Sequence, residues 1–179
     1  MESNAKKLKM PATVGEIMVK AAPFLFIQIA ILFTIMFVKT VLAGSMVASP
    51  VFIFIGTIIG FFGILLHELL HAIVYPCGAT VFIGIIPKHF AAVALASYPL
   101  KRSRFIVMSL LPLVLGIVPI LIFCVTSSSH VKLNGFCYGL SIIGLVSPYP
   151  DLYNVFQVLR QTENNCTLQF YEDDLYSIK

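Results

Sequence analysis

The sequence predicts an all-α membrane protein with about four transmembrane helices and a short β-hairpin or re-entrant element between the second and third helices. Hydrophobic residues make up 59% of its 179 residues and charged residues only 11%, against roughly 25% charged in a soluble protein. A soluble domain of this length has too little interior to bury so much apolar surface. Four uncharged stretches also approach or exceed the roughly 18 apolar residues that span a bilayer. They cover residues 21–38, 48–66, 105–129 and 133–150.

The remaining segments give the predicted organisation. Residues 1–20 form a polar N-terminal tail, residues 21–160 a single membrane-embedded domain, and residues 161–179 an acidic C-terminal tail that we expect to be loosely ordered. Lysine and arginine gather in the first tail and in residues 76–104, so the positive-inside rule predicts that both termini and this segment face the cytoplasm. The prediction is a multi-pass protein of the cell membrane. A long signal peptide cut near Ala43 is the alternative for the first apolar stretch.

Two features of the apolar stretches concern their packing. Lys39 ends the first stretch, and we expect its ammonium group to extend toward the membrane interface. The pairs Gly56 and Gly60, and Gly135 and Gly139, are each four residues apart. Small residues at this spacing allow two helices to approach closely.

Composition also excludes several partners. The net charge of +4 comes from short flanking segments, and no basic stripe interleaved with aromatic residues predicts a nucleic-acid partner. The expected surroundings are the lipid bilayer.

The four cysteines form no Cys-x-x-Cys pair, so neither a zinc ribbon nor a redox pair is indicated. Cys124 and Cys137 flank one loop and are either a disulfide in an oxidising compartment or, as we favour, buried thiols.

The segment 76–104 differs from an ordinary loop. Two short apolar runs, residues 80–86 and 91–98, flank the sequence Pro87-Lys88-His89-Phe90. The first run is rich in β-branched and aromatic residues, which favours a hairpin or re-entrant element. Such a hairpin either holds an extended peptide by strand addition or is a linker packed on the helices.

The second apolar stretch leads into His67-Glu68-Leu69-Leu70-His71. On a helix, residues four apart share a face, so both imidazoles can reach one metal ion. Glu68 lies beside that ion, where it can accept a proton from a water molecule. Ionisable groups in a lipid-length apolar stretch are costly, which indicates function.

A catalytic zinc usually takes a third protein ligand, and depth in the membrane favours Asp151. His67 lies about 24 Å and Asp151 about 26 Å along their stretches, counted from the same side of the membrane. Pro148 and Pro150 should break the helix just before Asp151. Asn154, one turn later, can hold this carboxylate or a substrate carbonyl. The other downstream candidates are His89, Glu163, Glu172, Asp173 and Asp174, while His130 is expected in an outer loop.

These residues resemble a known group of enzymes. The His-Glu-x-x-His motif, followed by Pro150-Asp151 on a later stretch, is similar to the intramembrane zinc metalloproteases of the site-2 protease type. The small size, Leu111-Pro112 in the third stretch and the aspartate in the fourth resemble the bacterial putative zincin peptidase family. The likeness covers residues 50–160.

The resemblance implies a function and a set of roles. His67, His71 and Asp151 are then zinc ligands, and Glu68 is the catalytic base. The implied activity is hydrolysis of peptide bonds in a membrane-embedded protein or peptide by zinc-activated water. The alternative is a non-catalytic zinc-binding membrane protein that acts as a scaffold, accessory or immunity factor. A metal transporter is less favoured, because ion passage does not need Glu68 as a base.

Overall fold

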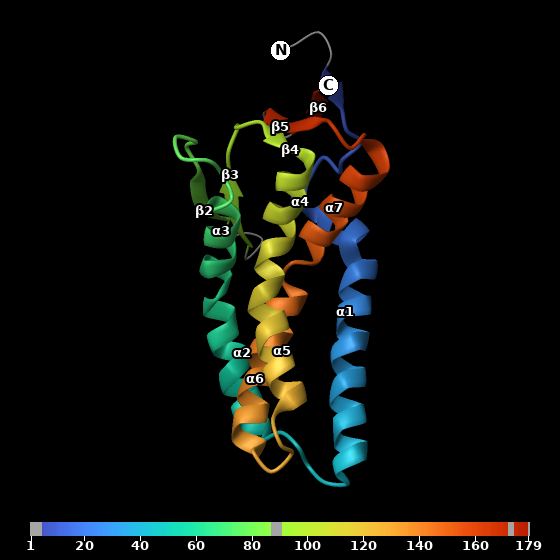
Figure 1. Cartoon of the computed structure of the whole chain (residues 1–179), viewed down its shortest axis with the longest axis vertical. Coiled ribbons are helices and arrows are strands. Elements are labelled where there is room, and N and C mark those ends of the chain that lie inside the picture. The colour runs from blue at the N-terminus through green and yellow to red at the C-terminus, as the bar shows by residue number, and fades with distance from the viewer. Residues whose placement is uncertain (1–4, 87–90, 172–173, 179) are drawn as a thin grey trace. The chain divides into compact units, whose positions relative to one another are not determined.

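The computed structural model describes residues 5–86, 91–171 and 174–178, apart from the side chains of residues 85–95. Figure 1 labels its helices and strands. The chain divides into two compact units, each made of segments that are distant in the sequence. The sheet unit comprises Met1–Ala22, His67–Leu111 and Pro150–Lys179, and the helix unit comprises Pro23–Leu66 and Pro112–Tyr149.

The helix unit is a group of apolar helices. It contains α2 (Pro50–Phe62), α5 (Val114–Val125), α6 (Val131–Val146) and the later part of α1 (Val14–Ala43). Helix α6 packs against both α2 and α5 (Figure 1). A Cβ atom on Gly139 would overlap the carbonyl oxygen of Ile53, and one on Gly56 would overlap that of Phe136. The predicted close approach of these helices at their glycines is therefore confirmed.

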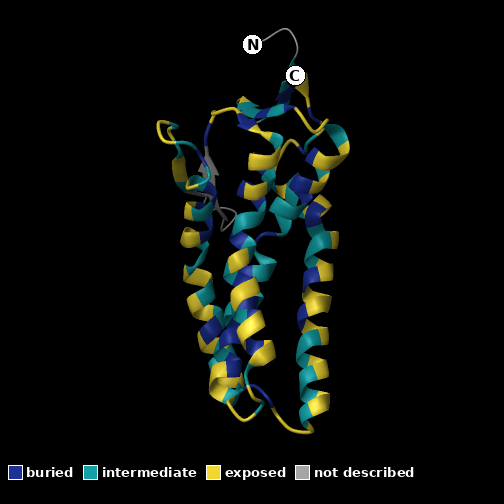
Figure 2. Cartoon of the chain, viewed as in Figure 1, coloured by how far each residue is buried: buried dark blue, intermediate teal, exposed yellow. Residues whose placement is uncertain are grey.

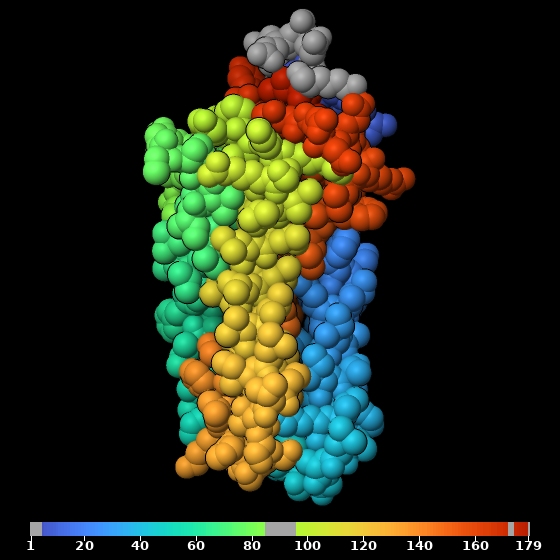
Figure 3. Space-filling view, in the orientation of Figure 1, coloured from blue at the N-terminus to red at the C-terminus, as the bar shows by residue number. Residues whose placement is uncertain are grey.

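Large apolar side chains are exposed along the helices. Figure 2 shows exposed residues on α1, α2 and α5, and side chains of α1 and α5 form part of the surface seen in Figure 3. They include Phe26, Phe33, Phe54, Phe62 and Leu121. An extended apolar surface of this kind is typical of a protein that contacts membrane or another protein.

The number of helices that can span a membrane is smaller than the sequence predicted. Among the described residues, Val14–Ala43 and Arg102–Val125 are long and apolar enough to cross a bilayer, and Pro50–Phe62 with Ile64–Ala72 is a third if this bent pair is one span. Val131–Val146 is apolar but has only 16 residues. The structure thus supports two or three spans, and the predicted count of four is not confirmed.

The second apolar stretch is a bent pair of helices. Helix α2 ends at Phe62, α3 (Ile64–Ala72) follows, and the two are bent by 41°. At the break, the backbone N–H of Gly63 donates to the carbonyl oxygen of Gly60 at 2.9 Å and to that of Ile59 at 3.2 Å. Glycines weaken the helix at this point, which explains why one apolar run gives two helices.

Lys39, which is partly exposed, reaches the C-terminal end of α5. Its ammonium group donates to the carbonyl oxygen of Thr126 at 2.7 Å and to that of Phe123, at the C-terminal end of α5. A cation at a helix C-terminus stabilises the exposed carbonyl groups there. Cys124 and Cys137 are both free thiols.

The sheet unit corrects the all-α prediction. It contains an antiparallel sheet with the strand order β1-β6-β5-β4. The strands are β1 (Ala5–Lys7), β4 (Leu100–Lys101), β5 (Thr167–Tyr171) and β6 (Asp174–Ile178). The expectation of a loosely ordered C-terminal tail is wrong, because Leu168 and Leu175 are each only 1% exposed and anchor β5 and β6 in a core.

The predicted hairpin between the second and third apolar stretches is confirmed. Strand β2 (Phe82–Ile86) pairs antiparallel with β3 (Ala91–Leu95), and Phe82 lies opposite Leu95. His89, in the connection between them, lies outside the described residues. Strand addition of a peptide at this hairpin stays a prediction.

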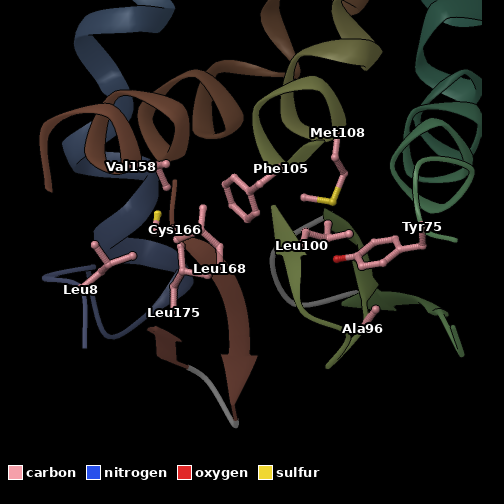
Figure 4. Packing of buried hydrophobic residues seen from close by; sticks show 10 residues of the cluster. All are labelled: Leu8, Tyr75, Ala96, Leu100, Phe105, Met108, Val158, Cys166, Leu168 and Leu175. Atoms are coloured by element: carbon pink, nitrogen blue, oxygen red, sulfur yellow. The ribbon is translucent and has the colours of Figure 1, made fainter. Parts of the chain in front are cut away.

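One apolar core fixes the helices of the sheet unit, α4 (Arg102–Leu110) and α7 (Tyr149–Gln161). Phe105 and Met108 of α4 and Val158 of α7 are part of it. Figure 4 shows these side chains with the apolar residues of the strands. Arg104 Nε also donates to the carbonyl oxygen of Val74 at 2.6 Å, which ties α4 to the chain just after α3.

Candidate metal centre

Helix α3 presents the three residues of the His-Glu-x-x-His motif to the interior. His67, Glu68 and His71 are 6%, 5% and 8% exposed. The two histidines are one helical turn apart, and their rings meet edge to face with centroids 4.8 Å apart. Their Nε2 atoms are 3.0 Å apart. The predicted common face is therefore present, and it is buried within the sheet unit.

Asp151 approaches both histidines from α7. Its Oδ2 atom lies 3.3 Å from His67 Nε2, and its Oδ1 atom lies 3.6 Å from His71 Nε2. The chain breaks between α6 and α7, as predicted from Pro148 and Pro150, and Asp151 occupies the first turn of α7. A carboxylate is favoured at a helix N-terminus, and the prolines fix where that terminus falls.

The donor atoms match the dimensions of a tetrahedral zinc site. Two donor atoms at the usual zinc distances are about 3.3 Å apart in such a site. The Nε2 atoms of His67 and His71 are 3.0 Å apart, and each has one oxygen of the Asp151 carboxylate, Oδ2 and Oδ1 respectively, at 3.3 and 3.6 Å. Two imidazoles with one carboxylate are also a donor set that zinc accepts. The residues present thus fit the metal in both chemistry and spacing.

Glu68 is the second carboxylate of the centre. Its Oε1 atom lies 3.9 Å from His67 Nε2, and its ligand atom lies within 4.8 Å of those of both histidines. Asp151 is closer to His67 and also reaches His71 at 3.6 Å. Of the two carboxylates, Asp151 thus lies closer to the Nε2 atom of His67.

A backbone carbonyl orients His71. The Nδ1 atom of His71 lies 2.8 Å from the carbonyl oxygen of Met108 on α4. A carbonyl oxygen only accepts, so Nδ1 carries a proton, and when the ring is neutral the lone pair is on Nε2. This role of Met108 is not predictable from its residue type, because a backbone carbonyl is common to every residue. The sequence feature connected with this carbonyl is Pro112, four residues after Met108.

Asn154 lies one turn after Asp151 on α7 and is half-buried. Its Oδ1 atom is buried and has no hydrogen-bond partner among the described residues. An unpaired buried acceptor costs free energy, so this atom is suited to receive a hydrogen bond from a bound molecule.

The other predicted candidates lie elsewhere or outside the described residues. Glu163 is exposed on the sheet unit, and His130 is exposed in the helix unit. Asp174 pairs with Lys7 across β6 and β1. Glu172 and Asp173, like His89, fall outside the described residues.

Comparison with known proteins gives one match. The model of a family described as "Putative zincin peptidase" matches residues 60–167. This region begins before the His-Glu-x-x-His motif and includes Asp151 and Asn154. No curated protein and no solved structure matches the chain.

Proposed function

The chain belongs to the putative zincin peptidase family, and from this membership and the geometry of the centre we propose that it is a zinc metallopeptidase that works within a membrane. The observation that carries the proposal is the convergence of His67, His71 and Asp151, whose donor atoms are 3.0 to 3.6 Å apart. In this proposal these three residues hold the zinc ion.

The chemistry divides between the metal and the chain. A bound zinc ion supplies Lewis acidity, which makes water nucleophilic near neutral pH and stabilises negative charge on a carbonyl oxygen. Glu68 accepts the proton of the attacking water and returns it to the leaving amine. Its burial beside His67 keeps this carboxylate close to the reacting atoms. Asn154 Oδ1 accepts a hydrogen bond from a backbone N–H of the substrate and so orients it.

The proposed substrate is a peptide segment embedded in the membrane. His67, Glu68 and His71 lie on a helix that continues the apolar α2, and this pair is long enough to be one span. A substrate that reaches the centre from the bilayer needs no water-filled approach of its own. We propose that the protein resembles the site-2 proteases in acting on a substrate within the membrane.

We also propose the topology that the sequence predicts, with four spans in the cell membrane and both termini in the cytoplasm. This topology requires the 16-residue helix Val131–Val146 as a fourth span beside the two or three that length and composition support. Its support is the distribution of lysine and arginine along the chain. Reporter domains fused to each terminus test it, and opposite locations for the two termini would contradict an even number of spans.

The test of the activity is Glu68→Gln, measured on the full chain reconstituted in lipid vesicles. The probe is an apolar helical peptide labelled at both ends and inserted in the same vesicles. We expect the wild type to cleave it and the variant to retain its zinc but lose about 10²- to 10⁴-fold in rate. Glu163→Gln, the same change at an exposed glutamate, is the matched control and should cleave normally.

Two outcomes would overturn the proposal. Cleavage that persists undiminished in Glu68→Gln would remove Glu68 as the base. A wild type that binds zinc but cleaves neither this peptide nor a library of apolar helical peptides would favour the non-catalytic alternative.

A further inference from the structure

The contact between His71 and the carbonyl of Met108 depends on an unusual feature of the backbone. Met108 lies inside a helical segment that runs from Arg102 to Val125. Inside a helix, a carbonyl oxygen normally accepts from the N–H group four residues later. The oxygen of Met108 instead accepts from a side chain on another helix, at 2.8 Å.

The sequence explains why this oxygen is available. The residue four positions after Met108 is Pro112, which has no backbone N–H to donate. The other helical donor within reach is the N–H of Leu111, in the tighter 3₁₀ geometry. That group is already used, because it donates to the carbonyl oxygen of Val107.

The proline ring has a second effect on the same carbonyl. In a helix, the ring of a proline clashes with the carbonyl of the residue four positions earlier and pushes it away from the axis. Here that carbonyl belongs to Met108, and a 3₁₀ turn, Leu111–Leu113, replaces the regular helix at this point. A proline inside a helix is strongly unfavourable relative to alanine, which makes its presence at position 112 notable.

We propose that Pro112 is a positioning residue for the metal centre: by withholding a backbone N–H it leaves the Met108 carbonyl free to hold His71 in the tautomer that binds metal. The inference rests on the proposed zinc site, but it concerns the state of His71 before any metal binds. With the proton held on Nδ1, the lone pair on Nε2 faces His67 and Asp151. In the other tautomer, a proton on Nε2 would occupy the place of the metal.

The test restores the missing donor with Pro112→Ala. The new N–H competes for the Met108 carbonyl, so in metal-free protein we expect His71 to shift from the Nδ1–H toward the Nε2–H tautomer. Nitrogen-15 NMR of histidine-labelled protein reports this directly, and the chain has only four histidines. Zinc affinity, measured by competition with a chelator, should fall about 10- to 100-fold, as for other groups that orient a metal ligand.

A second variant separates the missing N–H from the shape of the ring. It carries lactic acid at position 112, which has the side chain of alanine but an ester oxygen in place of the N–H. We expect this variant to recover the Nδ1–H tautomer and the zinc affinity. The matched control is Pro119→Ala in the same segment, because the carbonyl four residues before it belongs to Leu115 and has no described contact with the centre.

The outcomes are distinct from those of the peptidase test. An unchanged tautomer in Pro112→Ala, or equal shifts in the alanine and lactic acid variants, would overturn the inference. An equal shift in Pro119→Ala would also overturn it, since the effect would then follow from general helix geometry. If the protein proves not to cleave peptides, the tautomer and affinity results still decide the role of Pro112.

Discussion

The two units of the chain differ in the ionisable side chains that they bury. Among the described residues, the sheet unit buries His67, Glu68 and His71, whereas the polar side chains buried in the helix unit are the neutral ones of Gln28, Asn134 and Ser141. Each of the neutral three donates to a carbonyl oxygen of its own unit. Burying ionisable groups is costly unless they are paired or bind metal. Among the described residues, the candidate metal centre and the buried ionisable groups therefore lie in the sheet unit.

The units also differ in how their elements are held together. Helices of the helix unit meet at glycines, where their backbones are in contact. The sheet unit relies on a core of larger apolar side chains, which fixes α4 and α7 around the centre. If this division is correct, substitutions at the helix contacts of the helix unit should change stability alone, and substitutions around the centre in the sheet unit should change metal binding. Pro112 is the proposed exception, because it begins a segment of the helix unit and lies four residues after Met108.

The largest expected effect is on zinc binding in the sheet unit. Asp151→Ala removes a proposed zinc ligand, so zinc affinity should fall by about 100-fold or more. Loss of a residue that only orients a ligand costs about 10- to 100-fold. Metal analysis and chelator competition on purified protein measure it. Glu163→Gln is the control and removes the alternative acidic ligand; an equal loss there, or none in Asp151→Ala, would contradict the assignment.

A change of stability alone is expected in the helix unit. Gly139→Ala places a methyl group against the carbonyl oxygen of Ile53, and overpacking of this kind costs about 1–3 kcal/mol. Reversible unfolding in detergent measures the loss, and zinc affinity of the folded protein should be unchanged. Gly15→Ala, at an exposed position with no atom within 4 Å, should change stability by less than about 0.5 kcal/mol. A parallel loss of zinc affinity in Gly139→Ala would break the division between the units.

The smallest effect concerns the internal lysine of the helix unit. Lys39→Met removes the donor that binds the carbonyl oxygens of Phe123 and Thr126, which should cost about 1–2 kcal/mol. Lys132→Met is the control, because Lys132 is exposed and its Nζ lies 5.9 Å from the ring of Phe52; it should cost at most about 0.5 kcal/mol. Equal stability of Lys39→Met and the wild type would show that the lysine does not secure the end of α5.

Several features of the fold follow from sequence patterns. The hairpin of Phe82–Ile86 and Ala91–Leu95 was predicted from two apolar runs rich in strand-forming residues. The C-terminal strands differ from the predicted tail, because their polar and acidic residues conceal a short alternation of apolar and polar positions. The alternation indicates strands only when a core is known to bury its apolar positions, as it buries Leu168 and Leu175.

The candidate centre was predictable to a different degree at each residue. The spacing of His67 and His71 on a helix determines their common face, and the depth of Asp151 along its apolar stretch placed it near them. The role of the Met108 carbonyl was not predictable, since it depends on a contact between two helices.

The most direct test of the central claim is X-ray absorption spectroscopy of the zinc-loaded protein. We expect a first shell of nitrogen and oxygen atoms at about 2.0–2.1 Å, with scattering from two imidazole rings. In Asp151→Ala the imidazole scattering should remain, and the rest of the first shell should change. A sulfur atom at about 2.3 Å would indicate a cysteine ligand instead. That result, or a shell without imidazole scattering, would contradict a zinc centre at His67, His71 and Asp151.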